Sequence, residues 1–465
     1  MPGVLAYGAY VPYHRLRREA IAAALGEGGG RGTRAVASYD EDTTSMAVEA
    51  ARVALRAAPA SAPPGRVYFA TADPAYLDKT NATVVHAALG LDRSALAVDM
   101  AGSVRSGVGA LVAAADAPVP ALAVLADVRT GLPGGADERD GGDGAAAFLF
   151  GDGDTVADVV AVASATDEFL DRWRLPGAPA SRVWEERFGE HAYLPLAAAA
   201  LSAALEEAGL APDAVDHLVV AGTHARAARS FTARAGVPAD RVADPLAATV
   251  GNTGTAHAGL LLAGVLDRAG PGETVVVVVL ADGATAIVLR TTGALAGRRP
   301  SPSLADQVAR GDDGLGYATY LSWRGHLTRE PPRRPDPVGP AAPPSHREEA
   351  WKYAFRGSRC EACGTVHLPP VRVCVSCGAV DRMAPAPMAD VPGTVATFTL
   401  DRLAWSPNPP IVAAVVDFDG GGRFTCELTD VAPDAVAIGL RVEMTFRRLL
   451  TAGGVHNYFW KARPR

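Results

Sequence analysis

The chain has 465 residues, of which 49% are hydrophobic, and a formal net charge of −7. This length and apolar content allow two to four domains with sizeable cores, and the negative charge argues against nucleic acid as a partner. No apolar run reaches membrane-spanning length, and the amino terminus lacks the charged start and long apolar core of a signal peptide. We therefore expect a cytoplasmic protein that does not enter a membrane.

The first part of the chain, residues 1–295, alternates β-branched runs with alanine-rich stretches. This alternation is typical of a layered α/β domain. The expected strands cover residues 67–71, 121–126, 145–150, 217–221 and 274–280. The expected helices cover residues 44–57, 194–208 and 256–268.

A faint internal repeat divides this part into two halves, residues 1–165 and 166–295. In the first half an apolar strand over residues 121–126 leads, after a long loop, to the segment 143–150. In the second half the strand over residues 274–280 leads directly to the similar segment 282–289. The repeat suggests a duplicated α/β unit with a pseudo-twofold axis.

From residue 296 the composition changes to a proline-rich tether, which we expect to cover residues 296–350. Proline removes backbone donors and favours extended geometry, and residues 331–344 are especially rich in it. An aromatic, helix-like segment, residues 317–324, interrupts the tether. We expect this segment to dock on a partner surface.

Two cysteine pairs follow the tether and hold four of the five cysteines of the chain. In each pair the thiols are three positions apart, and the pairs are Cys360 with Cys363 and Cys374 with Cys377. Thiolates at this spacing favour a tetrahedral Zn²⁺, and four protein ligands leave no open position for catalysis. The alternatives are two disulfides or a redox dithiol, with His367 as a possible replacement ligand. We expect structural zinc in a ribbon over residues 351–385.

After the ribbon, short β-type runs separated by turns cover residues 393–400, 410–417, 422–428 and 441–446. Short strands at even spacing are typical of a small closed barrel. We expect an OB-type barrel over residues 386–465.

Zinc ribbon and barrel together, entered through Trp351–Cys360, resemble the DUF35 family of acyl-CoA-associated proteins. Residues 1–295 resemble the thiolase superfamily, especially 3-hydroxy-3-methylglutaryl-CoA synthase and ketoacyl synthase III, through residues 40–51, 79–90 and 250–254. The resemblance implies a duplicated thiolase-like αβαβα fold, a homodimer, and an acyl-CoA or acyl-carrier thioester as substrate. It also implies that two proteins usually found as separate subunits are fused here.

The resemblance also implies an oxyanion-stabilising pair. The Gly-Asn-Thr motif of the family matches at Gly251–Thr253, so Asn252 corresponds to its active-site asparagine. The histidine expected some thirty residues earlier corresponds to His224. In the family these two donors hold a thioester oxygen while negative charge develops on it. Read alone, either residue more often caps or satisfies local backbone.

The nucleophile and base of the family do not match. The ungapped register of residues 99–111 puts Val104 at the cysteine position, and a valine cannot attack a thioester. Ser103 is the neighbouring hydroxyl, although a helix N-cap is its commoner role. Ala72 stands where the synthase keeps its glutamate base, with Asp73 adjacent as a substitute.

Three hypotheses follow in order of preference. The first is an enzyme that forms or cleaves a C–C bond next to a CoA thioester without an acyl-enzyme, such as a retro-aldol or noncovalent Claisen-type step. The second is an acyltransferase that uses Ser103. The third is a catalytically silent acyl-CoA-binding or scaffold protein. The sequence leaves three questions open: which acyl group is bound, in which direction the reaction runs, and whether another protein supplies the base.

Overall fold

The computed structural model describes residues 2–330, 332–333 and 337–465. The chain forms two compact units. Unit 1 contains residues 1–38, 42–83 and 92–326, and unit 2 contains residues 39–41, 84–91 and 327–465. Residues 296–326, which the sequence places in the tether, thus belong to unit 1. Positions 331 and 334–336 of the predicted tether lie outside the described residues.

A nine-stranded mixed sheet forms the framework of unit 1. Its order is β11-β12-β13-β8-β1-β7-β6-β4-β5. The strands of the first half are β1 Gly3–Tyr10, β4 Arg66–Thr71, β5 Leu96–Ala101, β6 Ala121–Asp127 and β7 Gly144–Gly151. Those of the second half are β8 Ala157–Ala165, β11 His217–Gly222, β12 Thr274–Leu280 and β13 Ala284–Thr291.

The predicted repeat is visible in the pairing of these strands. In the first half β4 is parallel to β6, β6 is antiparallel to β7, and β7 is antiparallel to β1. In the second half β11 is parallel to β12, β12 is antiparallel to β13, and β13 is antiparallel to β8. The duplicated α/β architecture is therefore confirmed.

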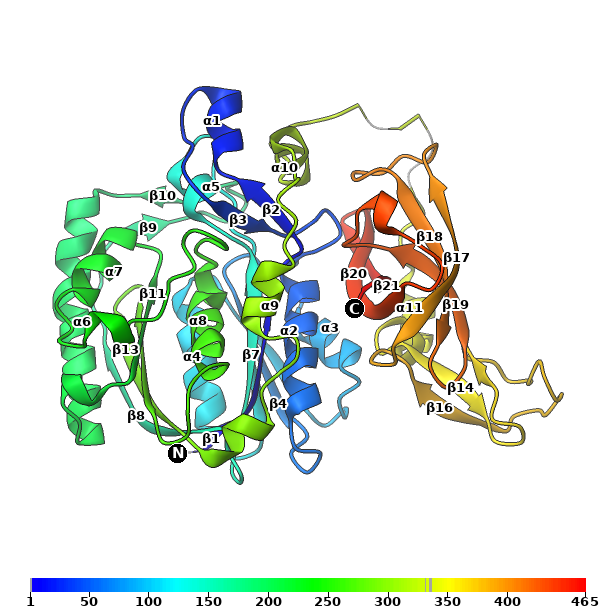
Figure 1. Cartoon of the computed structure of the whole chain (residues 1–465), viewed down its shortest axis with the longest axis horizontal. Coiled ribbons are helices and arrows are strands. Elements are labelled where there is room, and N and C mark those ends of the chain that lie inside the picture. Colours follow the sequence, from blue (N-terminus) through cyan, green and yellow to red (C-terminus); the bar gives the residue numbers. More distant parts are fainter. Residues whose placement is uncertain (1, 331, 334–336) are drawn as a thin grey trace. The chain divides into compact units, whose positions relative to one another are not determined.

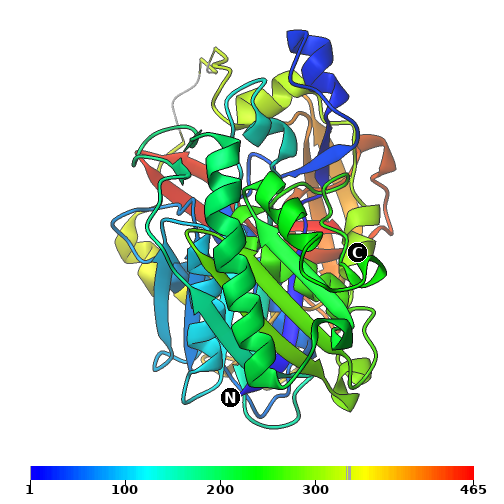
Figure 2. The same ribbon diagram turned by 90° about the vertical axis from the view of Figure 1, so that its left-hand side faces the viewer.

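Helices complete five layers (Figure 1). Helix α2, Thr43–Ala57, covers the outer face of β1, β6 and β7. Helices α4, Arg105–Ala115, and α8, His257–Leu266, lie between the two halves, where they share one apolar core. Helices α6, Glu186–Ala208, and α7, Ala225–Thr232, cover the second half, as Figure 2 shows for α6. The order is αβαβα, as expected.

The aromatic segment of the predicted tether forms α10, Tyr317–Trp323, inside unit 1. Tyr320 is fully buried and stacks on Tyr317, with ring centroids 6.1 Å apart. Arg34, also fully buried, donates to the Tyr320 hydroxyl over 3.1 Å. Tyr317 donates to Glu138. The segment therefore packs on its own unit through these two tyrosines, and docking on a partner stays a prediction.

Short elements connect these layers. They are β2 His14–Arg17, α1 Glu19–Leu25, β3 Thr33–Val36, α5 Ala136–Asp140, β9 Arg172–Trp173, β10 Arg182–Val183 and α9 Leu304–Ala309. Helix α3, Ala82–Ala88, belongs mostly to unit 2. In the part of the chain that the structure describes, no helix has the length and apolar character that crossing a membrane requires.

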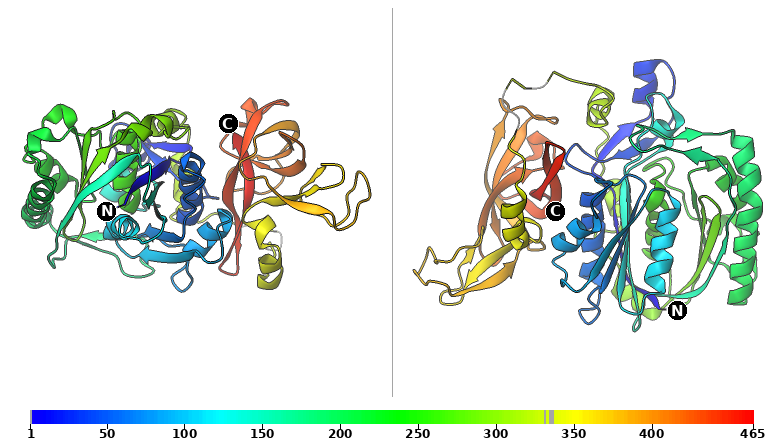
Figure 3. Two further views of the ribbon diagram at one scale, coloured as in Figure 1. Left: turned by 90° about the horizontal axis from the view of Figure 1, so that it is seen from below. Right: turned by 180° about the vertical axis from the view of Figure 1, so that it is seen from behind.

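Unit 2 contains the ribbon and the barrel (Figure 3). Helices α11 Ala342–Arg347 and α12 Glu349–Lys352 precede the ribbon strands β14 Arg356–Cys360, β15 Val366–His367 and β16 Met383–Pro387. The closed five-stranded barrel has the order β17-β18-β19-β21-β20. Its strands are β17 Gly393–Asp401, β18 Ile411–Phe418, β19 Arg423–Leu428, β20 Arg441–Ala452 and β21 Val455–Pro464. Buried and part-exposed residues alternate along β18, as one face fills the barrel.

Because Tyr320 is buried in unit 1, substitutions of this residue test whether unit 1 extends to residue 326. Replacing Tyr320 by Ala removes a buried ring and should lower the free energy of unfolding of unit 1 by about 3–5 kcal/mol. Tyr320→Phe removes only the acceptor of the Arg34 bond and should cost about 1–3 kcal/mol. Hydrogen exchange at increasing urea measures unit 1 separately. An unchanged free energy in Tyr320→Ala would place α10 outside the unit.

Candidate active site and metal centre

The turn between β5 and α4 carries Val104, the residue at the position that the sequence predicts for the nucleophile. Gly102 has a φ of +117°, a conformation that strongly favours glycine, and Val104 takes the N-cap position of α4. Val104 packs against the apolar core with its isopropyl group partly buried. No hydrogen bond of the Ser103 hydroxyl is found among the described residues, so the capping role expected for this serine is not observed.

The loop that carries Asn252 packs directly on α4. A Cβ atom at Gly107 of α4 would lie only 2.6 Å from the carbonyl oxygen of Thr255, so the two backbones approach closely. The Asn252 amide donates to the carbonyl of Gly222 over 2.7 Å, and its oxygen accepts from Gly254 N–H over 2.9 Å. These two bonds fix the amide plane and leave the second N–H of Asn252 available as a donor.

His224 follows Gly222 by two residues and lies at the N-cap of α7. Its Nδ1 accepts the backbone N–H of Ala227 over 3.0 Å. In the neutral ring the proton is therefore on Nε2, which makes that atom a donor. Nε2 is buried and has no hydrogen-bond partner among the described residues. Asn252 bonds to Gly222, the last residue of β11, and His224 follows that residue by two positions. Both predicted donors are therefore at one strand end.

Asp171 is a site residue that the sequence did not reveal. Its Oδ1 lies 3.9 Å from His224 Nε2, and this oxygen too is buried without a hydrogen bond in the described part of the chain. Burial raises the pKa of Asp171, whereas His224 and Arg172 act against the rise. A Cβ at Gly189 would lie 2.4 Å from Asp171 Oδ1 and 2.6 Å from His224 Nε2. The glycine therefore leaves just enough space for this pair.

The end of β4 is followed by Ala72, the residue at the position that the sequence predicts for the base. Ala72 offers no proton acceptor in its side chain. The Asp73 carboxylate lies 3.5 Å from Arg174, and its side chain is 44% exposed. Burial raises the pKa of Asp73, and Arg174 lowers it. Asp73 is thus near the expected position and engaged in a partly screened ion pair.

One buried carboxylate joins these segments. Asp127, at the end of β6, is fully buried. Its Oδ1 accepts from the Thr71 hydroxyl over 3.0 Å and from Ala72 N–H over 2.7 Å. Its Oδ2 accepts from Thr255 N–H over 2.7 Å. Asp127 therefore connects the end of β4 with the Asn252 loop.

No thiol is available in unit 1. The cysteine outside the ribbon, Cys426, lies on β19 of the barrel, and burial raises its pKa to about 12. The site thus offers two N–H donors, on His224 and Asn252, with the carboxylate of Asp171 beside His224. This arrangement can stabilise an oxyanion, but it lacks the thiolate that forms an acyl-enzyme.

The four ribbon cysteines form a separate cluster in unit 2. Their Sγ atoms lie within 4.8 Å of one another, with 3.7 Å between Cys360 and Cys377 and 3.5 Å between Cys363 and Cys374. Zn–S bonds of about 2.3 Å in a tetrahedron require sulfur separations of about 3.8 Å. The thiols thus fit one zinc ion, and His367 is not part of the cluster.

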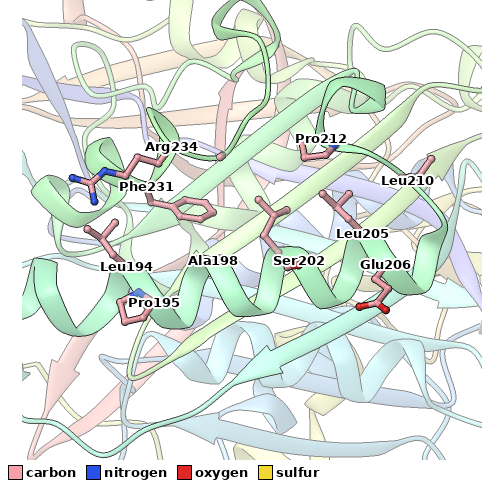
Figure 4. A pocket seen from close by; sticks show the side chains of 12 residues that line it. Leu194, Pro195, Ala198, Ser202, Leu205, Glu206, Leu210, Pro212, Phe231 and Arg234 are labelled. Atoms are coloured by element: carbon pink, nitrogen blue, oxygen red, sulfur yellow. The ribbon is translucent and has the colours of Figure 1, made fainter.

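A groove on the outer face of α6 lies away from these residues. It encloses about 650 Å³ and is mainly apolar, with Phe231 and Leu205 among its lining residues and Arg234 at one end (Figure 4). None of the residues predicted for the site lines it. The groove therefore adds no group to the site described above.

Family models match three parts of the chain. They are the C-terminal part of 3-oxoacyl-[acyl-carrier-protein] synthase III at residues 205–291, the ChsH2 rubredoxin-like zinc ribbon domain at residues 347–381 and the ChsH2 C-terminal OB-fold domain at residues 387–447. The last two confirm the predicted ribbon and barrel.

Curated relatives match 69% of the chain. Hydroxymethylglutaryl-CoA synthase of Pyrobaculum aerophilum is 31% identical over 340 residues, which are 69% of this chain and 97% of the relative. The same enzyme of Caldivirga maquilingensis is 30% identical over 338 residues, again 69% and 97%. The solved structure of MvaS with 3-hydroxy-3-methylglutaryl coenzyme A covers 73% of this chain and 94% of its own, with a TM-score of 0.58 and 21% identity.

The ribbon geometry predicts about one zinc ion per chain. Replacing any one of the four ribbon cysteines by Ser should remove the metal and unfold the ribbon, because binding supplies folding free energy directly. Cys426→Ser is the matched control and should retain the ion. Elemental analysis of the purified variants measures the ratio. A folded ribbon without metal would contradict the assignment.

Proposed function

Because the chain belongs to the hydroxymethylglutaryl-CoA synthase family of the thiolase superfamily, we propose that unit 1 binds an acyl-CoA thioester. We further propose that it makes or breaks the C–C bond next to the thioester carbonyl without forming an acyl-enzyme. The observation that carries this proposal is the combination of Val104 at the nucleophile position with the donors of His224 and Asn252.

The donor pair suits a step in which the thioester becomes an enolate. Negative charge then accumulates on the thioester oxygen, and the N–H groups of Asn252 and His224 would stabilise it there. Both side chains are held by backbone bonds, to Gly222 and Ala227, so little reorganisation is needed. The burial of His224 would strengthen its bond to a charged oxygen.

In the cleavage direction a base removes the proton from a hydroxyl group on the β carbon. The O–H electron pair forms a carbonyl, the Cα–Cβ bond breaks, and its electron pair enters the thioester enolate. A proton then returns to Cα. Asp73 is the candidate base within unit 1, because it adjoins Ala72 at the predicted base position and because a raised pKa makes its carboxylate a stronger base. No thiol and no redox cofactor is required, and the condensation is the reverse sequence.

Two other functions have weaker support. An acyltransferase would use Ser103, but no base is hydrogen-bonded to this hydroxyl among the described residues. A silent acyl-CoA-binding or scaffold protein agrees with the loss of the cysteine and the glutamate at Val104 and Ala72. It leaves unexplained why the buried Nε2 of His224 is kept without a partner, at a cost in stability.

The remaining assignments of the protein follow from the same proposal. Zinc in the ribbon is structural, and CoA thioesters are substrates. Reduced thiolates suit the cytoplasm. Two copies would pair through unit 1, since a twofold homodimer is the commonest closed assembly and β5 is the last strand of the sheet.

The donor roles predict a large loss of turnover. His224→Ala and Asn252→Ala should each lower kcat by about 10²–10³, the usual effect of deleting an oxyanion donor. The control is His191→Ala, an exposed histidine of α6, which should leave kcat unchanged. A panel of 3-hydroxyacyl-CoA esters, with the released carbonyl compound and shortened acyl-CoA measured by mass spectrometry, provides the assay. Full activity of both donor variants would overturn the site.

The dimer is tested on the complete chain. Light scattering after size exclusion at micromolar concentration should give the mass of two chains. Replacing Val98 in the middle of β5 by Pro removes a backbone donor and interrupts the outer edge of the sheet, and should shift the mass toward one chain. A wild-type mass of one chain would contradict the proposed pairing.

A further inference from the structure

Three arginines gather beside the candidate active site, and two of them are already paired. Arg172 donates two hydrogen bonds to Asp137, over 2.7 and 2.8 Å. Arg174 pairs with Asp73 and donates to the carbonyl of Ala72. The guanidinium of Arg129 differs from both. Within the described residues it has neither a hydrogen bond nor an ion pair, and its nitrogens are not among the fully buried unpaired atoms.

The stem of Arg129 packs against the two backbone segments on either side of the Asn252 loop. A Cβ atom at Gly254, two residues after Asn252, would lie 2.9 Å from Arg129 Cδ. A Cβ atom at Gly141, which forms a β-bridge with Asn252, would lie 3.1 Å from Arg129 Cβ. Glycines on both sides thus leave the space through which this side chain reaches the site.

The backbone of Arg129 is fixed independently of its side chain. Its N–H donates to Asp143 over 2.8 Å, and its carbonyl accepts from Arg34 over 2.7 Å. Asp143 and Arg34 are both fully buried. A substitution of the Arg129 side chain therefore keeps the bonds that position this segment.

The charges around Arg129 are mixed, and the neighbouring carboxylates already have partners. Burial lowers the pKa of its guanidinium, Asp127 and Asp137 act against that change, and Arg172 and Arg174 lower the pKa further. Both oxygens of Asp127 accept hydrogen bonds from other groups, and Asp137 is paired with Arg172. A guanidinium whose fork of donors is unused suits a bidentate carboxylate.

We propose that Arg129 binds a carboxylate on the acyl part of the substrate, so that the preferred thioesters carry a second, anionic end. This inference rests on the proposed function for the place of the thioester, which Asn252 would hold. Because Arg129 flanks Asn252, its anion lies within a few bonds of the thioester carbonyl. The phosphates of CoA are at the far end of the pantetheine arm, which makes them the less suitable source of the same charge.

The test compares ligands that differ only in the terminal group. Glutaryl-CoA ends in a carboxylate and pentanoyl-CoA in a methyl group, and CoA alone reports the contribution of its phosphates. Calorimetric titration of the full chain should show glutaryl-CoA binding about 10- to 100-fold more tightly than pentanoyl-CoA. Arg129→Gln should remove this preference and leave the affinity for CoA unchanged.

Two further variants keep the result interpretable. Arg129→Lys retains the charge without the fork and should keep part of the preference. Arg268→Gln, an exposed arginine of unit 1, is the matched control and should behave as the wild type. Equal binding of the two esters by the wild type, or a preference that survives in Arg129→Gln, would overturn the inference. So would an equal loss of affinity for CoA alone, which would assign the anion to a phosphate.

The outcomes also separate this inference from the proposed function. If the preference depends on Arg129 but no 3-hydroxyacyl thioester is turned over, the carboxylate site stands and the proposed catalysis fails. If turnover is found without any preference for a carboxylate, the catalysis stands and the role of Arg129 is wrong.

Discussion

The carboxylate of Asp127 is the constraint on which the candidate site depends. It is fully buried, and it accepts hydrogen bonds from both the end of β4 and the loop that carries Asn252. A buried charge of this kind is tolerated only when its hydrogen bonds are satisfied, so the donors must stay in place. The strand end beside Asp73 and the turn that orients Asn252 are therefore held in a fixed relation.

Under the proposed function the site has donors for the thioester oxygen and lacks a nucleophile. Asn252 and His224 are oriented by backbone hydrogen bonds, and each keeps an N–H that makes no hydrogen bond among the described residues. At the start of α4 the partly buried side chain of Val104 packs against the core at the position predicted for the nucleophile. Donors without a nucleophile suit chemistry in which the thioester stays attached to CoA and only the adjacent carbon reacts.

Much of the fold follows from local sequence. The strand over residues 274–280 is almost all valine, and the structure places it at the same residues, buried on both faces. The ribbon cysteines were recognisable because two pairs at this spacing are typical of a zinc site. Helix α6 begins eight residues earlier than the predicted 194, at Glu186. The sequence did not predict this start because the first turns are polar and because Pro195, inside the helix, is a residue that usually breaks a helix.

The rest of the site depends on long-range contacts that leave no local pattern. Asp171 approaches His224 across 53 positions of sequence, and only the space above Gly189 permits the approach. Arg129 looks like one more surface arginine in the sequence, yet Gly141 and Gly254 place it beside Asn252. The aromatic sequence of helix α10 suggested a docking segment. In the structure Tyr320 of this helix is buried in unit 1, where its hydroxyl accepts a hydrogen bond from the buried Arg34.

Intact-protein mass spectrometry during turnover tests the central claim most directly. The wild type, incubated with a thioester that it demonstrably consumes, should show only its own mass, because no acyl-enzyme forms. Val104→Cys restores a thiol at the start of α4 and should gain the mass of one acyl group under the same conditions. A stable acyl adduct on the wild type, mapped to Ser103 or any other residue of unit 1, would contradict a noncovalent mechanism.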